Sequence, residues 1–154
     1  MRSGPMSTGN VLAPIILHLV DDPERMELIY RIRDEVFVRE QRLTDDARND
    51  PDDDISLHYL AYRDGRPVGV GRLTMIGNEG QIAWVAVRAD ARGGGIGKAL
   101  MQAMIARAER DGADYVMLNA QTHAIGFYEQ LGFETVGSIF HMGGIPHRVM
   151  VLRF

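Results

Sequence analysis

A glycine-rich segment, Arg92–Lys98, places the strongest constraint on the fold of this chain. An apolar run, residues 82–87, precedes it, and apolar residues at helical spacing follow it from Ile96 to Ala108. A turn of this kind, between a strand and a helix, leaves backbone N–H groups unpaired at the positive end of the helix dipole. Glycines also let an anion approach the backbone closely, because they carry no Cβ. The segment therefore predicts a binding site for phosphate or pyrophosphate.

Two common phosphate-binding motifs do not match the sequence of this segment. A Walker A loop requires G-x-x-x-x-G-K-[ST], but Arg92 occupies the position of its first glycine and Ala99 that of its hydroxyl. A Rossmann fingerprint requires G-x-G-x-x-G near the start of a strand-helix-strand unit, and here Lys98 replaces the third glycine. A nucleotide-binding P-loop protein is thereby disfavoured.

Length and charge limit the class of protein. The chain has 154 residues, a formal net charge of -4 and no cysteine. We expect one compact domain over residues 11–154, after a mobile N-terminal segment at residues 1–10. The acidic balance argues against nucleic-acid and membrane-surface partners, and the lack of cysteine removes thiolate nucleophiles and thiolate metal ligands. We therefore predict a cytoplasmic protein with no metal, no nucleic-acid partner and no membrane partner.

The apolar pattern predicts an ordered series of strands and helices. The expected elements are a strand at 15–19, a helix from Pro23 to about Arg39, a polar loop at 41–54, a hairpin at 57–63 and 67–75, a strand ending at Val87, a helix to Asp111, a strand at 115–119, a helix at 124–130 and closing strands near 135–140 and 147–154. The central strand-helix-strand crossover makes residues 81–87 and 115–119 run parallel. Ligands bind at the carboxyl ends of such strands, where the glycine segment lies.

Four motifs in order resemble the GNAT acyl-CoA-dependent N-acetyltransferases. Arg92–Gly97 matches that family's R-x-x-G-x-G pyrophosphate loop, and Asn119–Gln121 with Phe127–Phe133 resembles its second motif. Residues 36–41 and 144–147 are similar to its ElaA-like branch. The resemblance runs from about residue 31 to the C-terminus. It implies the GNAT fold, an α/β fold with a mixed, mostly antiparallel sheet, a central parallel strand pair that splays apart, and helices on both faces.

The same resemblance implies a reaction. Such an enzyme moves an acetyl group from acetyl-CoA to a primary amine of a small molecule or peptide, by direct attack in a ternary complex. The absence of cysteine and of a serine in a nucleophile elbow agrees with direct attack. The alternative is a non-catalytic sensor or regulatory module that binds acyl-CoA on the same fold. Many relatives are dimers, so a homodimer stays open.

The resemblance also assigns residues to the cofactor. The strand segment Val85–Val87 would pair with pantetheine and direct N–H groups at the acetyl carbonyl oxygen, while Asn119 and Tyr128 would reach the cofactor from the second motif. Tyr128 matches the tyrosine expected to give a proton to the departing thiolate. The complete predicted cofactor set is Val85, Ala86, Val87, Arg92, Gly93, Gly94, Gly95, Ile96, Gly97, Lys98, Asn119 and Tyr128.

The general base is less clear from the residues. Some family members carry a carboxylate on the strand before the glycine loop, but here that stretch is Gln81–Trp84. Glu40, His58 and His147 are the candidates, with Glu40 and His147 predicted as catalytic groups beside Tyr128. Deprotonation through water, or no base at all, stays open.

The acceptor side is predicted from the same resemblance. The residues expected around the acceptor are Arg33, Phe37, Gln41, His58 and Arg72. A charge at Arg72, in an otherwise apolar strand, requires a partner, either a substrate carboxylate or an acid such as Glu40. The acidic stretch 45–54 would attract a cationic amine or simply be a solvated loop. We expect Trp84 to lie in the core.

Overall fold

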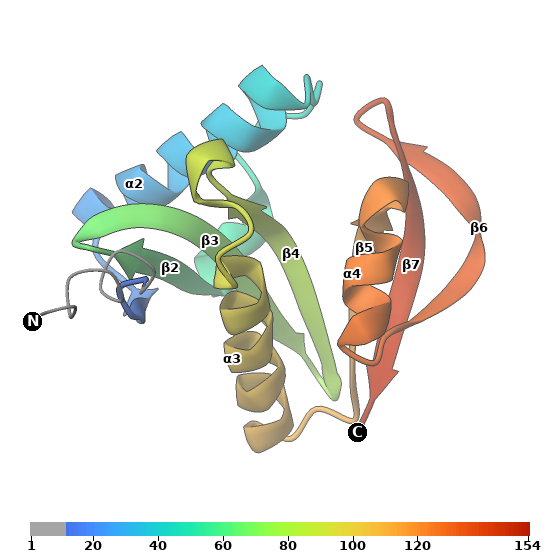
Figure 1. The fold of residues 1–154 in the computed structure, drawn as a ribbon. Coiled ribbons are helices and arrows are strands. Elements are labelled where there is room, and N and C mark those ends of the chain that lie inside the picture. The colour runs from blue at the N-terminus through green and yellow to red at the C-terminus, as the bar shows by residue number, and fades with distance from the viewer. Residues whose placement is uncertain (1–11) are drawn as a thin grey trace, which may run out of the picture.

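The computed structural model describes residues 12–154, so the mobile segment predicted at residues 1–10 lies outside the described part of the chain. Seven strands form one sheet in the order β1-β2-β3-β4-β5-β7-β6 (Figure 1). They are β1 (Ile15–Val20), β2 (Leu57–Arg63), β3 (Arg66–Ile76), β4 (Glu79–Val87), β5 (Tyr115–Gln121), β6 (Glu134–Met142) and β7 (Ile145–Arg153). The α-helices are α2 (Pro23–Arg33), α3 (Ile96–Arg110) and α4 (Ile125–Gln130).

The parallel pair predicted from the crossover is present at the centre of the sheet. β4 and β5 pair in parallel, whereas every other neighbouring pair in the described sheet is antiparallel. Their pairing extends only from Glu79 opposite Tyr115 to Gln81 opposite Met117. Beyond that point the two strands diverge, as Figure 1 shows. Their carboxyl-terminal halves therefore leave backbone groups unpaired on facing edges.

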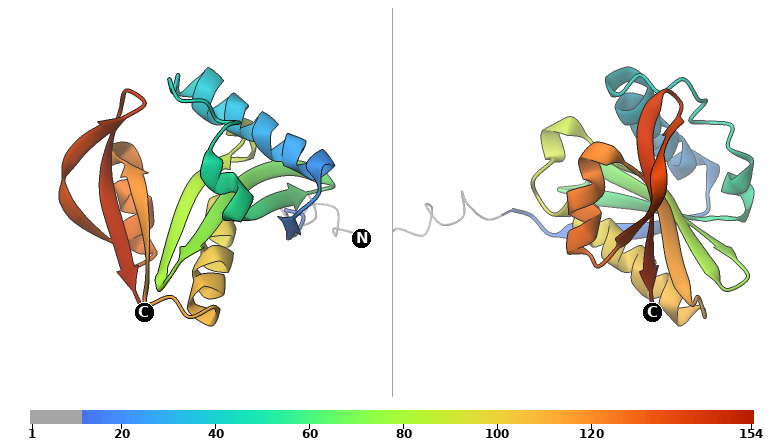
Figure 2. Two further views of the ribbon diagram at one scale, coloured as in Figure 1. Left: turned by 180° about the vertical axis from the view of Figure 1, so that it is seen from behind. Right: turned by 90° about the vertical axis from the view of Figure 1, so that its right-hand side faces the viewer.

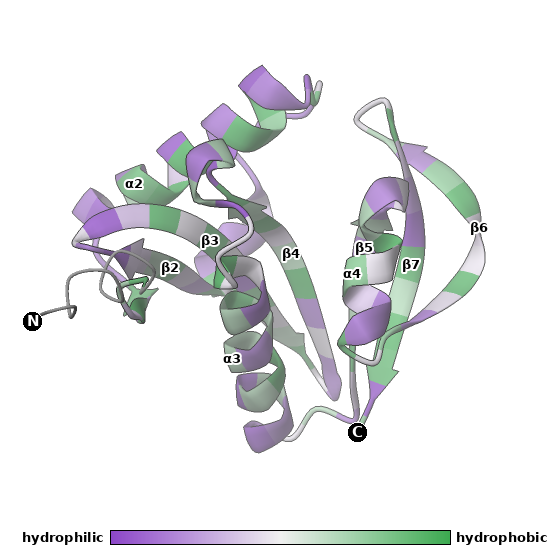
Figure 3. Ribbon diagram, in the orientation of Figure 1, coloured by the Kyte–Doolittle hydropathy of each residue, from purple (hydrophilic) through white to green (hydrophobic). Residues whose placement is uncertain are grey.

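Helices cover both faces of the sheet, as predicted (Figure 2). Leu100, Met101 and Met104 of α3 share one buried cluster with Phe133, which follows α4. Ile29 and Ile32 of α2 belong to a second cluster on the other side. Along α2 and α3, hydrophilic and hydrophobic segments alternate (Figure 3), as expected of helices that turn one side to a sheet and the other to water.

Two glycines of β3 lie close against α3. A Cβ added at Gly69 would lie 2.8 Å from Ile96 Cγ2, and one added at Gly71 would lie 2.6 Å from Met104 Cε. Real Cβ atoms do not approach so closely, so a larger residue at either position would require the Ile96 or Met104 side chain to shift. The two glycines thus allow α3 to pack closely against β3.

The N-terminal helix and the polar loop differ from the prediction in their local form. The predicted helix to Arg39 is α-helical only as far as Arg33 and continues as a π-helical segment, η1 (Asp34–Glu40). The predicted loop at 41–54 contains a 3₁₀ helix, η2 (Pro51–Ile55), which Asp50 caps through the Asp52 N–H. Short 3₁₀ helices, η3 (Ala89–Ala91) and η4 (Thr122–Ala124), precede the glycine segment and α4.

Candidate active site

Two adjoining cavities open where β4 and β5 diverge. The first, of about 760 Å³, lies under the glycine segment and is called the loop cavity. The second, of about 420 Å³, lies between β4, β5 and β7 and is called the strand cavity. The residues that line both are Gln41, Val85, His123, Ala124 and Tyr128. A ligand that occupied both cavities would therefore pass Tyr128.

The glycine segment has the geometry of an anion site. Gly93 and Gly95 adopt φ of 82°, a left-handed conformation that favours glycine. The first helical hydrogen bond of α3 runs from the Ala99 N–H to the Gly95 carbonyl, so the preceding N–H groups lack helical partners. Ile96 and Lys98 are among those unpaired positions and line the loop cavity.

Of the predicted phosphate-binding residues, Gly94 is the one that does not line the loop cavity. Its carbonyl instead accepts a hydrogen bond from Arg63 Nη2 at 3.1 Å, and Arg63 Nε donates to the Ala13 carbonyl at 2.9 Å. Arg63 thus ties the back of the glycine segment to the start of the chain described here. Nothing in the sequence pattern marked Arg63 for this role.

Arg92 does not project freely toward a ligand. Its guanidinium forms a two-pronged ion pair with Glu40, with Nη2 2.8 Å from Oε1, while its Nε donates to the Val87 carbonyl at 3.0 Å. Hydrogen bonding from Arg92 holds the pKa of the Glu40 carboxyl below its ordinary value. Glu40 lines the loop cavity and not the strand cavity, so it lies on the phosphate side and away from the predicted acceptor side.

The end of β4 carries a local irregularity that opens it to the cavities. Trp84 has φ of 54°, an uncommon conformation for a residue with a large side chain, and the register with β3 shifts between Val70 and Arg72. Val85 lines both cavities, and Ala86 and Val87 line the loop cavity. The predicted cofactor-pairing strand therefore borders the space in which a ligand would lie.

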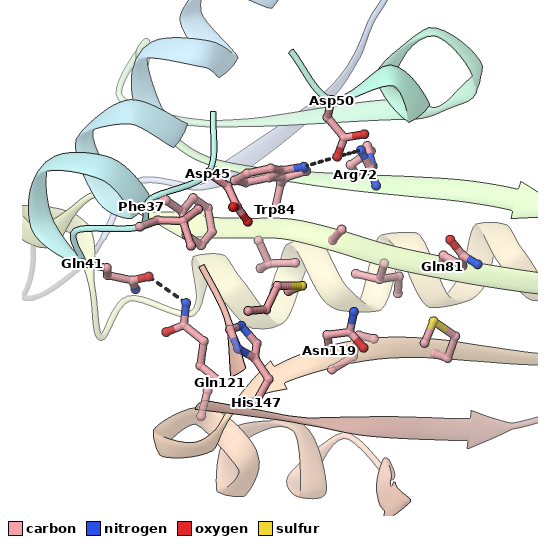
Figure 4. Close-up of a pocket in the computed structure, with 18 of the residues that line it drawn as sticks. Phe37, Gln41, Asp45, Asp50, Arg72, Gln81, Trp84, Asn119, Gln121 and His147 are labelled. Atoms are coloured by element: carbon pink, nitrogen blue, oxygen red, sulfur yellow. Dashed lines mark hydrogen bonds and ion pairs between the residues drawn. The ribbon is translucent and has the colours of Figure 1, made fainter. Parts of the chain in front are cut away.

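Trp84 packs against the core cluster around Phe37, as expected, but it is only half-buried and its other side lines the strand cavity. Its Nε1–H donates to Asp50 Oδ2 at 2.9 Å, so the polar group of the indole has a hydrogen-bond partner. Its ring meets Phe37 edge to face, with centroids 5.1 Å apart. The two aromatic side chains form one wall of the strand cavity (Figure 4).

Tyr128 lies at the junction of the two cavities. Its hydroxyl makes no hydrogen bond with any of the described residues, and burial raises the pKa of the phenol to about 12. At neutral pH the group therefore keeps its proton and has one to donate. Asn119 lines the strand cavity, not the loop cavity, which puts it beyond the phosphate end of the site.

His147 points into the strand cavity from β7, next to Gln121 and across from Trp84 (Figure 4). The side chain is only 4% exposed, and its ring stacks on Phe140 with centroids 5.8 Å apart. Its Nδ1 lies 2.7 Å from the Ile145 carbonyl oxygen, which can only accept, so Nδ1 carries the proton of the neutral ring. That hydrogen bond leaves a lone pair on Nε2.

Gln41 bridges the cavity walls, as Figure 4 also shows. Its Oε1 accepts a hydrogen bond from Gln121 Nε2 at 2.7 Å, which joins the segment after η1 to the end of β5. Phe37 and Gln41, both predicted around the acceptor, line the strand cavity.

Arg33 and His58 were predicted around the acceptor, but they line neither cavity. Arg33 is 1% exposed and forms a two-pronged ion pair with Asp53, with Nη1 2.8 Å from Oδ2. His58 Nε2 donates to the Asp53 carbonyl at 2.8 Å. Both side chains belong to a buried hydrogen-bond network behind the site, in which the charged Arg33 has the partner that a buried charge requires.

Arg72 does line the strand cavity, but its partner is not Glu40. Its Nη1 pairs with Asp50 at 2.8 Å and with Asp53 at 3.1 Å. Burial disfavours the charge on Asp50, yet hydrogen bonds from Trp84, the Asp52 N–H and Arg72 outweigh it and lower the pKa of that carboxyl. Sequence reasoning missed Asp50 and Asp53 as partners, although the acidic stretch and the charge requirement of Arg72 together pointed to that loop.

Within the part of the chain that the structure describes, no three or more His, Asp or Glu side chains are grouped so as to hold a metal ion. Among residues 12–154, no helix is both long enough and apolar enough to cross a membrane.

Comparisons with known proteins agree with this geometry. A family model described as "Acetyltransferase (GNAT) domain" matches residues 20–154. The chain is 32% identical over 134 residues to YjcF of Bacillus subtilis strain 168, named an uncharacterized N-acetyltransferase, with 86% of this chain and 96% of YjcF covered.

Two crystal structures have a similar fold. An acyl-CoA N-acyltransferase from Pseudomonas aeruginosa is 26% identical with a TM-score of 0.79, covering 90% of this chain and 99% of that one. Escherichia coli ElaA is 25% identical with a TM-score of 0.81, covering 91% of this chain and 100% of that one. The predicted fold and the predicted resemblance to ElaA are confirmed.

Proposed function

The chain belongs to the GNAT acetyltransferase family, and we propose that it moves an acetyl group from acetyl-CoA to a primary amine of a small molecule or peptide. The observation that carries the proposal is the position of Tyr128, at the junction of a cavity that ends in an anion site and a second cavity lined by polar side chains. The first suits a phosphorylated carrier and the second suits an acceptor. Attack is proposed to be direct, in a ternary complex.

The loop cavity would hold the pyrophosphate and the upper pantetheine arm. Backbone N–H groups at the start of α3 would bind the phosphates, with Lys98 and Arg92 supplying positive charge. Because Arg92 pairs with Glu40, cofactor binding would have to share or replace that ion pair. The opened edge of β4 at Val85–Val87 would pair with the pantetheine amide groups and direct an N–H at the acetyl oxygen.

The proposed chemical step uses Tyr128 at the junction of the cavities. The amine nitrogen attacks the thioester carbonyl carbon, a C–N bond forms, and negative charge collects on the carbonyl oxygen near β4. Collapse of this intermediate breaks the C–S bond. The thiolate takes the phenolic proton of Tyr128, whose raised pKa keeps that proton in place until sulfur develops charge.

His147 is our proposed general base in preference to Glu40 and His58. Its Nε2 carries a lone pair, because the Ile145 carbonyl holds the proton on Nδ1, and the side chain lines the strand cavity. It would accept the proton that the amine must lose. Glu40 is paired with Arg92 on the phosphate side, and His58 lines neither cavity.

A non-catalytic acyl-CoA sensor is the alternative on the same fold. The free phenol of Tyr128 and the open Nε2 of His147 favour an enzyme, since a sensor has no need of an acid and a base on one cavity. Release of CoA thiol, measured with acetyl-CoA and a panel of primary amines, separates the two. Amine-dependent release supports the proposal. Binding of acetyl-CoA with no release for any amine in the panel would favour the sensor.

A further inference from the structure

We propose that the acceptor carries a second positive charge, which Asp45 and Asp52 hold on the wall of the strand cavity opposite His147. The substrate class is then an alkyl diamine or a similar dication, not an amino acid bound through its carboxylate. This inference rests on the proposed function, because it concerns the amine that would accept the acetyl group.

The strand cavity is lined by more acidic than basic side chains. Three carboxylates line the strand cavity, those of Asp45, Asp50 and Asp52, and Arg72 supplies the one arginine or lysine among the described residues that line it. Arg72 is already neutralised by ion pairs with Asp50 and with Asp53 behind the wall. The wall therefore carries a surplus of negative charge and no free cation for a substrate carboxylate.

Asp50 differs from the other two carboxylates. Its Oδ2 accepts from Arg72 and from Trp84 Nε1, and its Oδ1 accepts from the Asp52 N–H at 2.9 Å. Both carboxylate oxygens of Asp50 are therefore occupied by partners within the protein. The carboxylates of Asp45 and Asp52 accept no hydrogen bond from any backbone or side-chain group of residues 12–154, so they are available to a ligand.

A second feature of the same cavity also points to a ligand. His147 is only 4% exposed and lines the strand cavity, and its Nε2 has no hydrogen-bond partner among the described residues. Figure 4 shows His147 and Asn119 on one wall and Asp45, Asp50 and Trp84 on the other. The acceptor would have its reacting nitrogen near His147 and Tyr128, with its far cation between the free carboxylates.

The aromatic part of the wall suits the same ligand. Trp84 and Phe37 lie beside Asp45 in Figure 4. The faces of aromatic rings attract cations, and the rings also pack against alkyl chains. The turn between β6 and β7 lies next to Asp45, since a Cβ added at Gly143 would lie 3.3 Å from Asp45 Oδ2. The cavity thus combines an apolar wall for a short chain with anions for its end.

The test compares amines that differ only at the far end. Butylamine, diaminobutane and γ-aminobutyrate have a methyl, an ammonium and a carboxylate there, respectively. We expect kcat/KM to be about tenfold higher for diaminobutane than for butylamine, as one charge-assisted contact would give, and lowest for γ-aminobutyrate. Asp45→Asn and Asp52→Asn should each lower the ratio of diaminobutane to butylamine. Asp54→Asn, at an exposed carboxylate that lines neither cavity, is the matched control.

Binding to the CoA complex, measured as a thermal shift, supplies a second readout. Diaminobutane should raise the midpoint more than butylamine does, and Asp45→Asn should remove the difference. Amine turnover with equal kcat/KM for the diamine and monoamine, or with a preference for γ-aminobutyrate, would overturn the inference and leave the proposed function standing. Diamine binding that depends on Asp45, with no release of CoA thiol, would support the cation site and contradict the proposed function.

Discussion

Tyr128 and His147 meet the two opposite demands of acetyl transfer because their surroundings differ. Tyr128 has no hydrogen-bond partner among the described residues, and burial raises its pKa to about 12, which favours the protonated phenol. His147 has its Nδ1 proton held by the Ile145 carbonyl, which leaves Nε2 able to accept a proton. One residue can thus give a proton at the cavity junction while the other receives one from the strand cavity.

Replacement of Tyr128 by phenylalanine should separate catalysis from binding. Tyr128→Phe removes the proton that the thiolate takes but keeps the ring that packs near Phe127 and Phe133. We expect kcat to fall by about 100-fold, the usual contribution of a general acid, while the Kd of acetyl-CoA changes little. Steady-state thiol release and calorimetric titration measure the two quantities. Unchanged kcat across the pH range would remove Tyr128 from the mechanism.

The role of His147 is tested by the basicity of the amine. An alkyl amine is protonated at neutral pH, so it must lose a proton before or during attack, whereas an aryl amine is already neutral. His147→Gln should lower kcat/KM for an alkyl amine by about 100-fold and for an aryl amine by much less. A purely structural role would lower both rates alike, and that result would contradict the assignment.

The sequence indicates single residues best where their neighbours lie close in the chain. Tyr128 is predicted from a short motif that the structure shows as α4, and Gly93 and Gly95 from a strand-to-helix turn that the structure also shows. The sequence did not predict that Glu40 pairs with Arg92, because 52 residues separate them and several acids were possible partners. The location of Arg33 behind the wall also depends on a distant carboxylate, Asp53.

The glycine segment between β4 and α3 was predicted with its ligand class, and its conformation can be tested. Gly95→Ala introduces a Cβ at φ of 82°, which should cost about 1–2 kcal/mol of stability and turn the neighbouring N–H groups away from the phosphates. We expect the KM for acetyl-CoA to rise by about tenfold or more, since charge-assisted hydrogen bonds to phosphate would be weakened.

Gly126→Ala in α4 is the control for that change. Gly126 has no atom within 4 Å of an added Cβ and is not at a positive φ, so alanine should stabilise its helix by up to about 1 kcal/mol. Thermal unfolding and acetyl-CoA saturation curves measure both variants. Equal KM values for the two would mean that the loop does not bind the cofactor through its backbone.

Some elements were beyond sequence reasoning because tertiary contacts determine their form. The helical period through Val36 and Phe37 is compatible with either α or π geometry, and the η1 segment widens where the chain leaves α2. The acidic stretch lacks an apolar period, so it was predicted as a loop. Its 3₁₀ helix forms where Asp50 and Asp53 fold onto Arg72, contacts that no local pattern encodes.

The buried network of Arg33, Asp53 and Arg72 joins α2, η2 and β3 into one support behind the strand cavity. Asp53 is the shared partner, so Asp53→Asn would leave two buried guanidinium groups under-compensated. We expect a loss of about 3–5 kcal/mol in the free energy of unfolding, measured by urea denaturation. Asp54→Asn, on the adjacent exposed residue, should change it by less than about 0.5 kcal/mol. Equal losses in the two variants would show that the network contributes no more than surface charge does.

The same network makes the stability of the fold depend on pH through His58. Burial lowers the pKa of this imidazole, which donates Nε2–H to the Asp53 carbonyl and leaves Nδ1 buried without a partner. A second proton would add positive charge beside Arg33 and Arg72. Because the pKa in the folded state is below the unfolded value of about 6.5, the stabilisation is complete above that pH and is lost as the pH falls below it.

Urea unfolding of the wild type between about pH 7.5 and pH 5 should therefore show a falling free energy, by at most about 1.4 kcal/mol per pH unit for one proton. His58→Gln keeps a donor for the Asp53 carbonyl but cannot titrate, so its free energy of unfolding should depend less on pH in this range. His141→Gln, at an exposed position on β6, should keep the wild-type slope. If the His58 and His141 variants have the same slope, the acid sensitivity of the fold arises elsewhere, and the buried imidazole is a packing group only.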